Sequence, residues 1–165
     1  MSVSTVAEHL QSRGVPFEVV PHAQAFTSIS EARALGISAD EVVKSVMLHT
    51  DSGYTLVAVP GYRRLDMKLV EAAVGEKHVR LATEEELTEA FPDFELGALP
   101  PLGSLLGVQV CVDPEVTAHE TVVFAAGTQT ESVKVRTEDL FRDEAVSVVP
   151  VTRHPEDADN EPGLR

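Results

Sequence analysis

A chain of 165 residues, 43% of them hydrophobic and 24% charged, is long enough to form one folded domain with a buried core. Its formal net charge of −14 argues against broad binding to DNA or other nucleic acid, because polyanion binders carry clustered Lys and Arg. No apolar run approaches the roughly 20 residues that span a bilayer, and the N-terminus lacks a signal-peptide layout. A soluble, cytoplasmic protein without membrane partners is therefore expected.

The first quarter of the chain predicts two short helices around a strand. Apolar residues at helical spacing predict a helix over 4–11, with Ser4 as its N-cap. Residues 15–20 alternate loosely and predict a strand. The pair Ser28 and Glu31 has the spacing of a capping box, which predicts a second helix beginning at Ser28.

The next segment predicts a β-hairpin and a helix. Two β-rich runs, 42–48 and 54–59, are joined by a short polar turn, which is typical of a hairpin. Asp66 can cap a helix that continues to residue 74. A brief strand over 77–81 follows.

The second half of the chain predicts two further short helices and several strands. Thr83 begins a second capping box, and Thr137 can cap a last short helix. Three strands are predicted over 108–112, 121–125 and 132–135, and a final strand over 146–149.

These elements predict an α/β protein of the α+β type. The helices are short and many strands are adjacent along the chain, so a mixed, curved sheet with peripheral helices fits better than regular βαβ alternation. We expect one domain over residues 1–150 and a disordered, acidic tail over 151–165.

Most familiar site patterns are absent from the sequence. The six histidines are scattered without H-x-x-x-H spacing, and the single cysteine, Cys111, lies in a strand-like setting typical of a buried small hydrophobe. There is no G-x-S-x-G elbow and no glycine-rich phosphate loop of the Walker or Rossmann type. No metal and no cofactor are therefore predicted.

Lys44 stands out because it is a cation within an apolar strand. Val42, Lys44 and Val46 share one face of the predicted strand. On a buried face the ammonium group needs an anion or hydrogen-bond acceptors. On an edge strand it would simply be exposed, and from the pattern alone we favour this second interpretation.

Two glycine-containing segments also have two interpretations. Residues 97–103 contain two prolines between two glycines and form either a rigid connector or a preorganised loop whose N–H groups bind an oxyanion. Residues 127–130 predict a four-residue hairpin turn, which could also place polar groups at the mouth of the sheet.

Several segments together resemble the YbaK family of aminoacyl-tRNA deacylases, which shares a domain with the editing insertion of bacterial prolyl-tRNA synthetases. The matching segments are VKSV (43–46), PGYRRLD (60–66), ATEEE (82–86), FPD (91–93), GALPPLG (97–103), VD (112–113) and FAAGTQT (124–130). Their order and spacing make the match specific, and it extends over about residues 3–149.

The resemblance implies a strongly bent, partly barrel-like mixed sheet and trans-editing hydrolysis of the ester bond in mischarged aminoacyl-tRNA. It makes Lys44 the essential lysine, near the terminal phosphate and the aminoacyl group, and Gly97 the second catalytic position, whose backbone stabilises the oxyanion. Substrate-binding positions follow in two segments: Ala98, Leu99, Pro100 and Pro101, and then Gly127, Thr128 and Gln129. The partners implied are the tRNA 3′ aminoacyl end and an aminoacyl-tRNA synthetase.

The chain departs from the family at Gln129, where many relatives have histidine. Glutamine can donate and accept hydrogen bonds but cannot carry a proton near neutral pH. A non-catalytic module that binds a tRNA end, a nucleotide or a synthetase therefore remains the alternative. The segment 43–80, with a net charge of +2, is where an anionic ligand is expected to bind.

Overall fold

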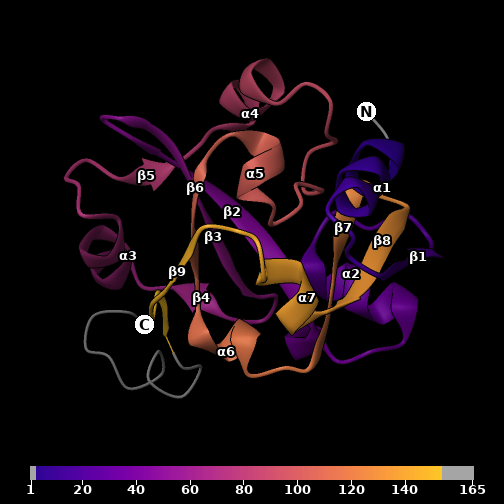
Figure 1. Cartoon of the computed structure of the whole chain (residues 1–165). Helices are drawn as coiled ribbons and strands as arrows, with labels where there is room; N and C mark the ends of the chain where they lie inside the picture. Colours follow the sequence, from indigo (N-terminus) through magenta and orange to yellow (C-terminus); the bar gives the residue numbers. More distant parts are fainter. Residues whose placement is uncertain (1–2, 154–165) are drawn as a thin grey trace.

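The protein is represented by a computed structural model, which describes residues 3–153 as a mixed sheet flanked by helices (Figure 1). The strands are β1 (Phe17–Pro21), β2 (Val42–Thr50), β3 (Gly53–Pro60), β4 (Arg64–Leu65), β5 (Arg80–Leu81), β6 (Gln109–Val112), β7 (Thr121–Thr128), β8 (Glu131–Arg136), β9 (Val146–Val148) and β10 (Thr152–Arg153). The helices are α1 (Val3–Ser12), α2 (Ser28–Leu35), the 3-10 helix η1 (Ala39–Glu41), α3 (Met67–Val74), α4 (Glu84–Ala90), α5 (Gly103–Leu106), α6 (Pro114–Thr117) and α7 (Thr137–Phe141).

The main sheet has the order β1-β8-β7-β2-β3-β6-β9, and β5 pairs with β2 beside this path. The predicted hairpin of β2 and β3 is antiparallel, whereas β2–β7, β3–β6 and β6–β9 are parallel. The predicted mixed α/β fold is therefore confirmed. Among the described residues the end strands β1 and β9 do not pair with each other, so the sheet is not a closed barrel.

The sheet carries an apolar cluster on each face. The larger cluster includes Phe124 of β7 and Leu10 of α1, both fully buried. The smaller cluster includes Val59 of β3 and Val70 of α3. Each such side chain contributes about 1.5–3 kcal/mol by leaving water, so both faces hold β2 in place. No helix among residues 3–153 is long and apolar enough to cross a membrane.

Two of the predicted helix caps are confirmed. The Asp66 carboxylate accepts hydrogen bonds from Lys68 N at 3.0 Å and Leu69 N at 3.3 Å. At α4, Thr83 Oγ1 accepts from Glu86 N, and the Glu86 carboxylate accepts from Thr83 N. Both helices therefore begin where short-range hydrogen bonds satisfy their first N–H groups.

Three other predicted caps are misplaced. The capping box of α2 pairs Thr27 with Ser30, because the Glu31 side chain turns into the protein instead of back to the helix start. Ser4 lies inside α1, which begins at Val3. Thr137 is the first residue of α7, so the cap position falls on Arg136.

The predicted turn at 127–130 is also shorter than expected. Gly127 and Thr128 belong to β7, and only Gln129 and Thr130 connect it to β8. The β7–β8 register shifts between Ala125 and Thr128, and Gly127 has a φ of 92°, which glycine adopts at low cost.

The folded part continues beyond residue 150, contrary to the predicted boundary of the tail. Val151 is fully buried, and β10 pairs with β4. The buried Asp113 carboxylate accepts hydrogen bonds from Val151 N at 3.0 Å, Thr152 N at 3.1 Å and Thr152 Oγ1 at 2.8 Å. Residues 151–153, predicted as part of the tail, thus belong to the domain, and residues 154–165 lie outside the described part.

Candidate functional site

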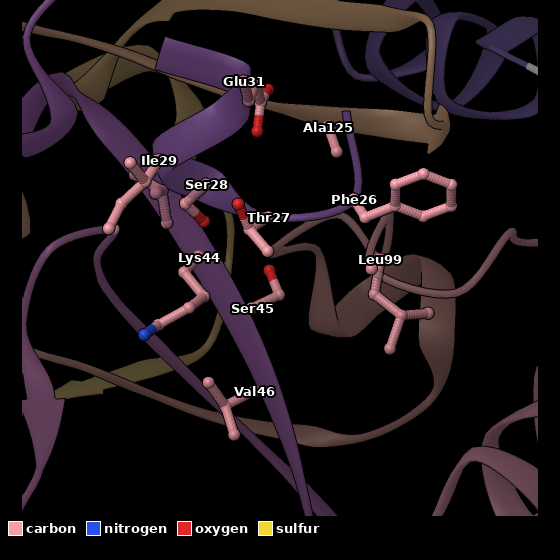
Figure 2. Close-up of a pocket in the computed structure, with 13 residues that line it drawn as sticks. Phe26, Thr27, Ser28, Ile29, Glu31, Lys44, Ser45, Val46, Leu99 and Ala125 are labelled. Atoms are coloured by element: carbon pink, nitrogen blue, oxygen red, sulfur yellow. The ribbon is translucent and has the colours of Figure 1, made fainter. Parts of the chain in front are cut away.

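A cavity of about 360 Å³ opens where β7 separates from β2. The parallel pairing of these strands is confined to Val42–Val123 and Val43–Phe124, and β5 pairs with β2 only at Leu48 and His49, so no strand covers this edge of β2 over residues 44–46. The walls are formed by the start of α2, by residues 43–46 of β2, and by Gly97 and Leu99 of the loop that follows α4 (Figure 2). The volume lies at the small end of the range for ligand pockets.

Lys44 lies on a central strand and is half-buried, so the exposed edge position favoured from the pattern is wrong. Its Nζ donates a hydrogen bond to Arg63 O at 3.2 Å. Burial lowers the pKa of Lys44 from its ordinary value. A backbone carbonyl satisfies one of three donors and brings no negative charge, so the ammonium group keeps donors for an anionic ligand.

Arg63, whose carbonyl oxygen accepts the hydrogen bond from Lys44, is held in place by contacts of its own side chain. Arg63 is 8% exposed; its Nη2 lies 3.6 Å from Glu115 Oε1, and its Nε donates to Tyr62 Oη at 3.3 Å. The guanidinium group also lies over the Tyr62 ring. These contacts fix the loop after β3 and hence the position of the Lys44 amine.

Ser45 faces the other side of β2 but also lines the cavity, because the cavity opens at the edge of the strand. Figure 2 shows its hydroxyl on the side of Thr27, whereas the Lys44 amine extends in another direction. Ser45 Oγ is buried and has no hydrogen-bond partner among the described residues. A buried polar group normally has a partner, so this hydroxyl is available to a ligand.

The backbone around Ser45 is also turned toward the opening. Val42 O accepts a hydrogen bond from Gly61 N of the chain that continues β3. Alternate residues of an antiparallel strand bond to the same neighbour, so the backbone groups of Lys44 and Val46 also point toward β3. Ser45 alternates with them, and its N–H and C=O therefore point to the side where β7 has left. The cavity combines a cation, a free hydroxyl and strand backbone at one edge.

The first turn of α2 forms the opposite wall. Phe26, Thr27, Ser28 and Ile29 all line the cavity, and Phe26 is 62% exposed at its rim. A helix start carries partial positive charge from its N–H groups. Lys44 and these N–H groups bring positive charge to the cavity, and Glu31, in the same first turn, brings a carboxylate.

Gly97 approaches the chain before α2 more closely than any other residue type could. Its φ is 78°, and a Cβ there would lie 2.5 Å from Phe26 O. The loop is tied to β7 by hydrogen bonds from Gly127 N to Ala98 O and from Glu95 N to Gly127 O, both 2.9 Å. Gly97 thus closes a wall of the cavity through its backbone.

Gln129 acts as a bridge beside the cavity, which it does not line. Its Nε2 donates to Leu96 O at 2.9 Å, and its Oε1 accepts from Gln24 Nε2 at 2.9 Å. Its backbone N donates to Glu95 Oε1 at 2.7 Å. The side chain therefore joins the Gly97 loop to the segment before α2.

The structure brings together part of the predicted set. Lys44, Gly97 and Leu99 line the cavity, while Ala98, Gly127 and Gln129 support its wall from behind. Pro100, Pro101 and Thr128 do not line it; the two prolines are buried, and Thr128 Oγ1 lies 3.4 Å from Glu131 Oε1.

Sequence reasoning missed several lining residues, among them Phe26, Thr27, Ser45 and Glu31. The spacing of Glu31 from Ser28 indicates a helix cap and gives no signal of burial. Ser45 lies within the VKSV motif that carries the resemblance, and this position is the one signal that could have identified it.

Other reactive groups lie elsewhere. Cys111 is buried on β6, and burial raises the pKa of its thiol. Among residues 3–153, no group of three or more His, Cys, Asp or Glu side chains could hold a metal ion.

Comparisons with known proteins place this chain among proteins that act on tRNA charging. The family model for the aminoacyl-tRNA editing domain matches residues 22–142. Proline–tRNA ligase of Streptomyces coelicolor is 33% identical over 137 residues, covering 81% of this chain and 24% of the ligase. The same enzyme of Thermosipho melanesiensis is 32% identical over 82 residues, covering 50% of this chain and 14% of the ligase. The chain thus spans about a quarter or less of the length of these relatives.

A solved structure of similar size has the same fold. It belongs to a protein proposed to be a trans-editing enzyme for prolyl-tRNA synthetase, with a TM-score of 0.82 and 26% identity. The match covers 93% of this chain and 99% of that protein.

Proposed function

The chain belongs to the aminoacyl-tRNA editing domain family, and from this we propose that it is a deacylase that hydrolyses the ester of a mischarged aminoacyl-tRNA in trans. The similarity over nearly the whole length of a protein proposed to edit for prolyl-tRNA synthetase supports action in trans. The observation that carries the proposal is the Lys44 ammonium group at a small cavity, where it donates to a backbone carbonyl. Such a group can bind a phosphate or carbonyl oxygen.

The proposed reaction needs no metal or cofactor. Water attacks the carbonyl carbon of the aminoacyl ester, the bond from that carbon to the ribose oxygen breaks, and the ribose oxygen takes the proton that the water loses. Negative charge develops on the carbonyl oxygen, where Lys44 and the backbone around Gly97 stabilise it. We assign the recognition of the terminal adenosine to the side of the cavity at Lys44, with Leu99 beside the aminoacyl group.

The acidic surface is compatible with a tRNA partner if contacts are confined to the acceptor end. Arg64 and Lys68 are exposed in the segment next to Arg63, whose carbonyl receives Lys44. Phosphates close to the cavity would meet these cations, because the field of a charge is local at physiological salt. A tRNA partner also implies a cytoplasmic location, and we propose an aminoacyl-tRNA synthetase as a second partner.

The proposal is tested with a panel of tRNAs mischarged with alanine, serine or cysteine. The wild type should release at least one amino acid faster than spontaneous hydrolysis, and Lys44→Ala should return the rate to background. Lys134→Ala, which changes an exposed lysine of β8 outside the cavity, is the matched control and should keep the wild-type rate. Background rates with the wild type for the whole panel would refute deacylation; binding of tRNA without hydrolysis would indicate the non-catalytic module instead.

A further inference from the structure

A buried carboxylate lines the cavity on the side away from the Lys44 amine. Glu31, in α2, is 5% exposed and belongs to the cavity wall. Figure 2 shows the Glu31 oxygens and the Lys44 nitrogen apart from each other, with Ser28 between them in this view. Burial raises the pKa of Glu31. Burying an ionised carboxylate lowers the free energy of unfolding, and a functional role would account for keeping it at this position.

The carboxylate is connected to a histidine through one hydroxyl. Ser132, which is fully buried, donates its O–H to Glu31 Oε2. The Ser132 oxygen lies 2.8 Å from His22 Nε2, and His22 Nδ1 lies 2.7 Å from Ala23 O. Because a carbonyl oxygen can only accept, Nδ1 must carry a hydrogen.

This geometry admits an ionised form of the cluster that is fully hydrogen-bonded. When Ser132 donates to an ionised Glu31, its oxygen accepts from Nε2–H, and His22 is then an imidazolium with both nitrogens donating. The positive charge lies on the far side of Ser132 from the cavity. His22 and Ser132 are therefore positioning residues that can hold a negative charge on Glu31 where it meets a ligand.

We propose that Glu31 receives the α-ammonium group of the aminoacyl ester, so that the cavity selects substrates whose amine is free. This inference rests on the proposed function and names the chemistry of its substrate. An aminoacylated terminal adenosine carries one cation, the α-ammonium group of its amino acid, together with ester oxygens and the phosphate of its nucleotide. The cavity is lined by one carboxylate, Glu31, and by one ammonium group, Lys44. These two charges are opposite to those of the α-ammonium group and of the phosphate that the same ligand carries.

The test uses two ligands that resist hydrolysis. Acceptor-stem minihelices are made with a 3′-terminal 3′-amino-3′-deoxyadenosine that carries alanine through an amide bond, either with a free amine or with an N-acetyl group. Dissociation constants are measured by titration at neutral pH for the wild type, Glu31→Gln and Glu89→Gln. Glu89 is an exposed carboxylate of α4 outside the cavity, and serves as the matched control.

The wild type should bind the free amine about tenfold or more tightly than the acetylated ligand, since a hydrogen bond to a charged group is of that strength. Glu31→Gln, which keeps an oxygen to accept from Ser132, should bind both ligands alike, and Glu89→Gln should behave as the wild type. Equal binding of the two ligands by the wild type, no binding of either, or unchanged discrimination in Glu31→Gln would overturn the inference. If Glu31→Gln does not fold, the wild-type ratio decides.

The same proteins separate this inference from the proposed function. A wild type that hydrolyses mischarged tRNA but binds both minihelices equally supports deacylation and refutes amine recognition by Glu31. A wild type that discriminates between the minihelices but hydrolyses no ester supports amine recognition and refutes deacylation.

Discussion

Replacing Gly97 by alanine perturbs the backbone contact that closes one wall of the cavity. The new Cβ would lie 2.5 Å from Phe26 O, and ordinary contact begins at 3.4 Å, so the two segments must separate by about 0.9 Å. Alanine at a φ of 78° costs a further 1–2 kcal/mol or so. A displacement of roughly 1 Å at a reacting group can lower a rate about 100-fold. We therefore expect Gly97→Ala to lose deacylation by about two orders of magnitude.

Gly107→Ala is the control for backbone strain alone. Gly107 has a φ of 73°, nearly that of Gly97, but a Cβ added there would have no other atom within 4 Å. It should therefore lose about 1–2 kcal/mol in urea unfolding and keep its deacylation rate. If Gly97→Ala retained the wild-type rate and were no less stable than Gly107→Ala, the close-contact argument would be wrong.

Two further predictions concern the surroundings of the cavity. Gln129→Ala removes the side-chain bonds to Leu96 and from Gln24, so its free energy of unfolding should fall by about 1–2 kcal/mol in urea titration; an unchanged value would show that the bridge does not hold the loop. Hydrogen bonds from Arg80 lower the pKa of Glu86 to about 2, so its stabilisation is present above the unfolded value of 4.5 and is lost as the pH falls toward 2. Glu86→Gln should thus unfold more easily than the wild type at pH 7 and approach it at pH 3, whereas an equal difference at both pH values would contradict the assignment.

Local signals predicted the elements whose stabilising contacts are close in sequence. The caps at Asp66 and Thr83 involve residues within three positions, and the hairpin of β2 and β3 has a short connection. The predicted cap of α2 is misplaced because Ser132, 101 positions away, holds the Glu31 carboxylate. No pattern around Ser28 contains that contact.

The environment of Lys44 could not be predicted from its strand. Alternation gives the face of a side chain but not the neighbours of the strand, and β2 becomes central through parallel pairing with Phe124 and the residue before it. The resemblance supplied Lys44 and Gly97 as site residues. It contained Ser45 within the VKSV motif without giving it a role, and it gave no indication of Glu31, because a single glutamate in a short helix has an ordinary structural explanation.

The hydrogen bonds of Asp113 have a practical consequence for fusing or transplanting this domain. They fasten Val151 and Thr152, and β10 in turn pairs with β4, which follows directly on Arg63 and its carbonyl. A linker joined at residue 150 would leave a buried carboxylate without three of its donors and release the strand next to the acceptor of Lys44. A graft must therefore retain the chain at least as far as Arg153, so that β10 and the hydrogen bonds of Asp113 stay intact.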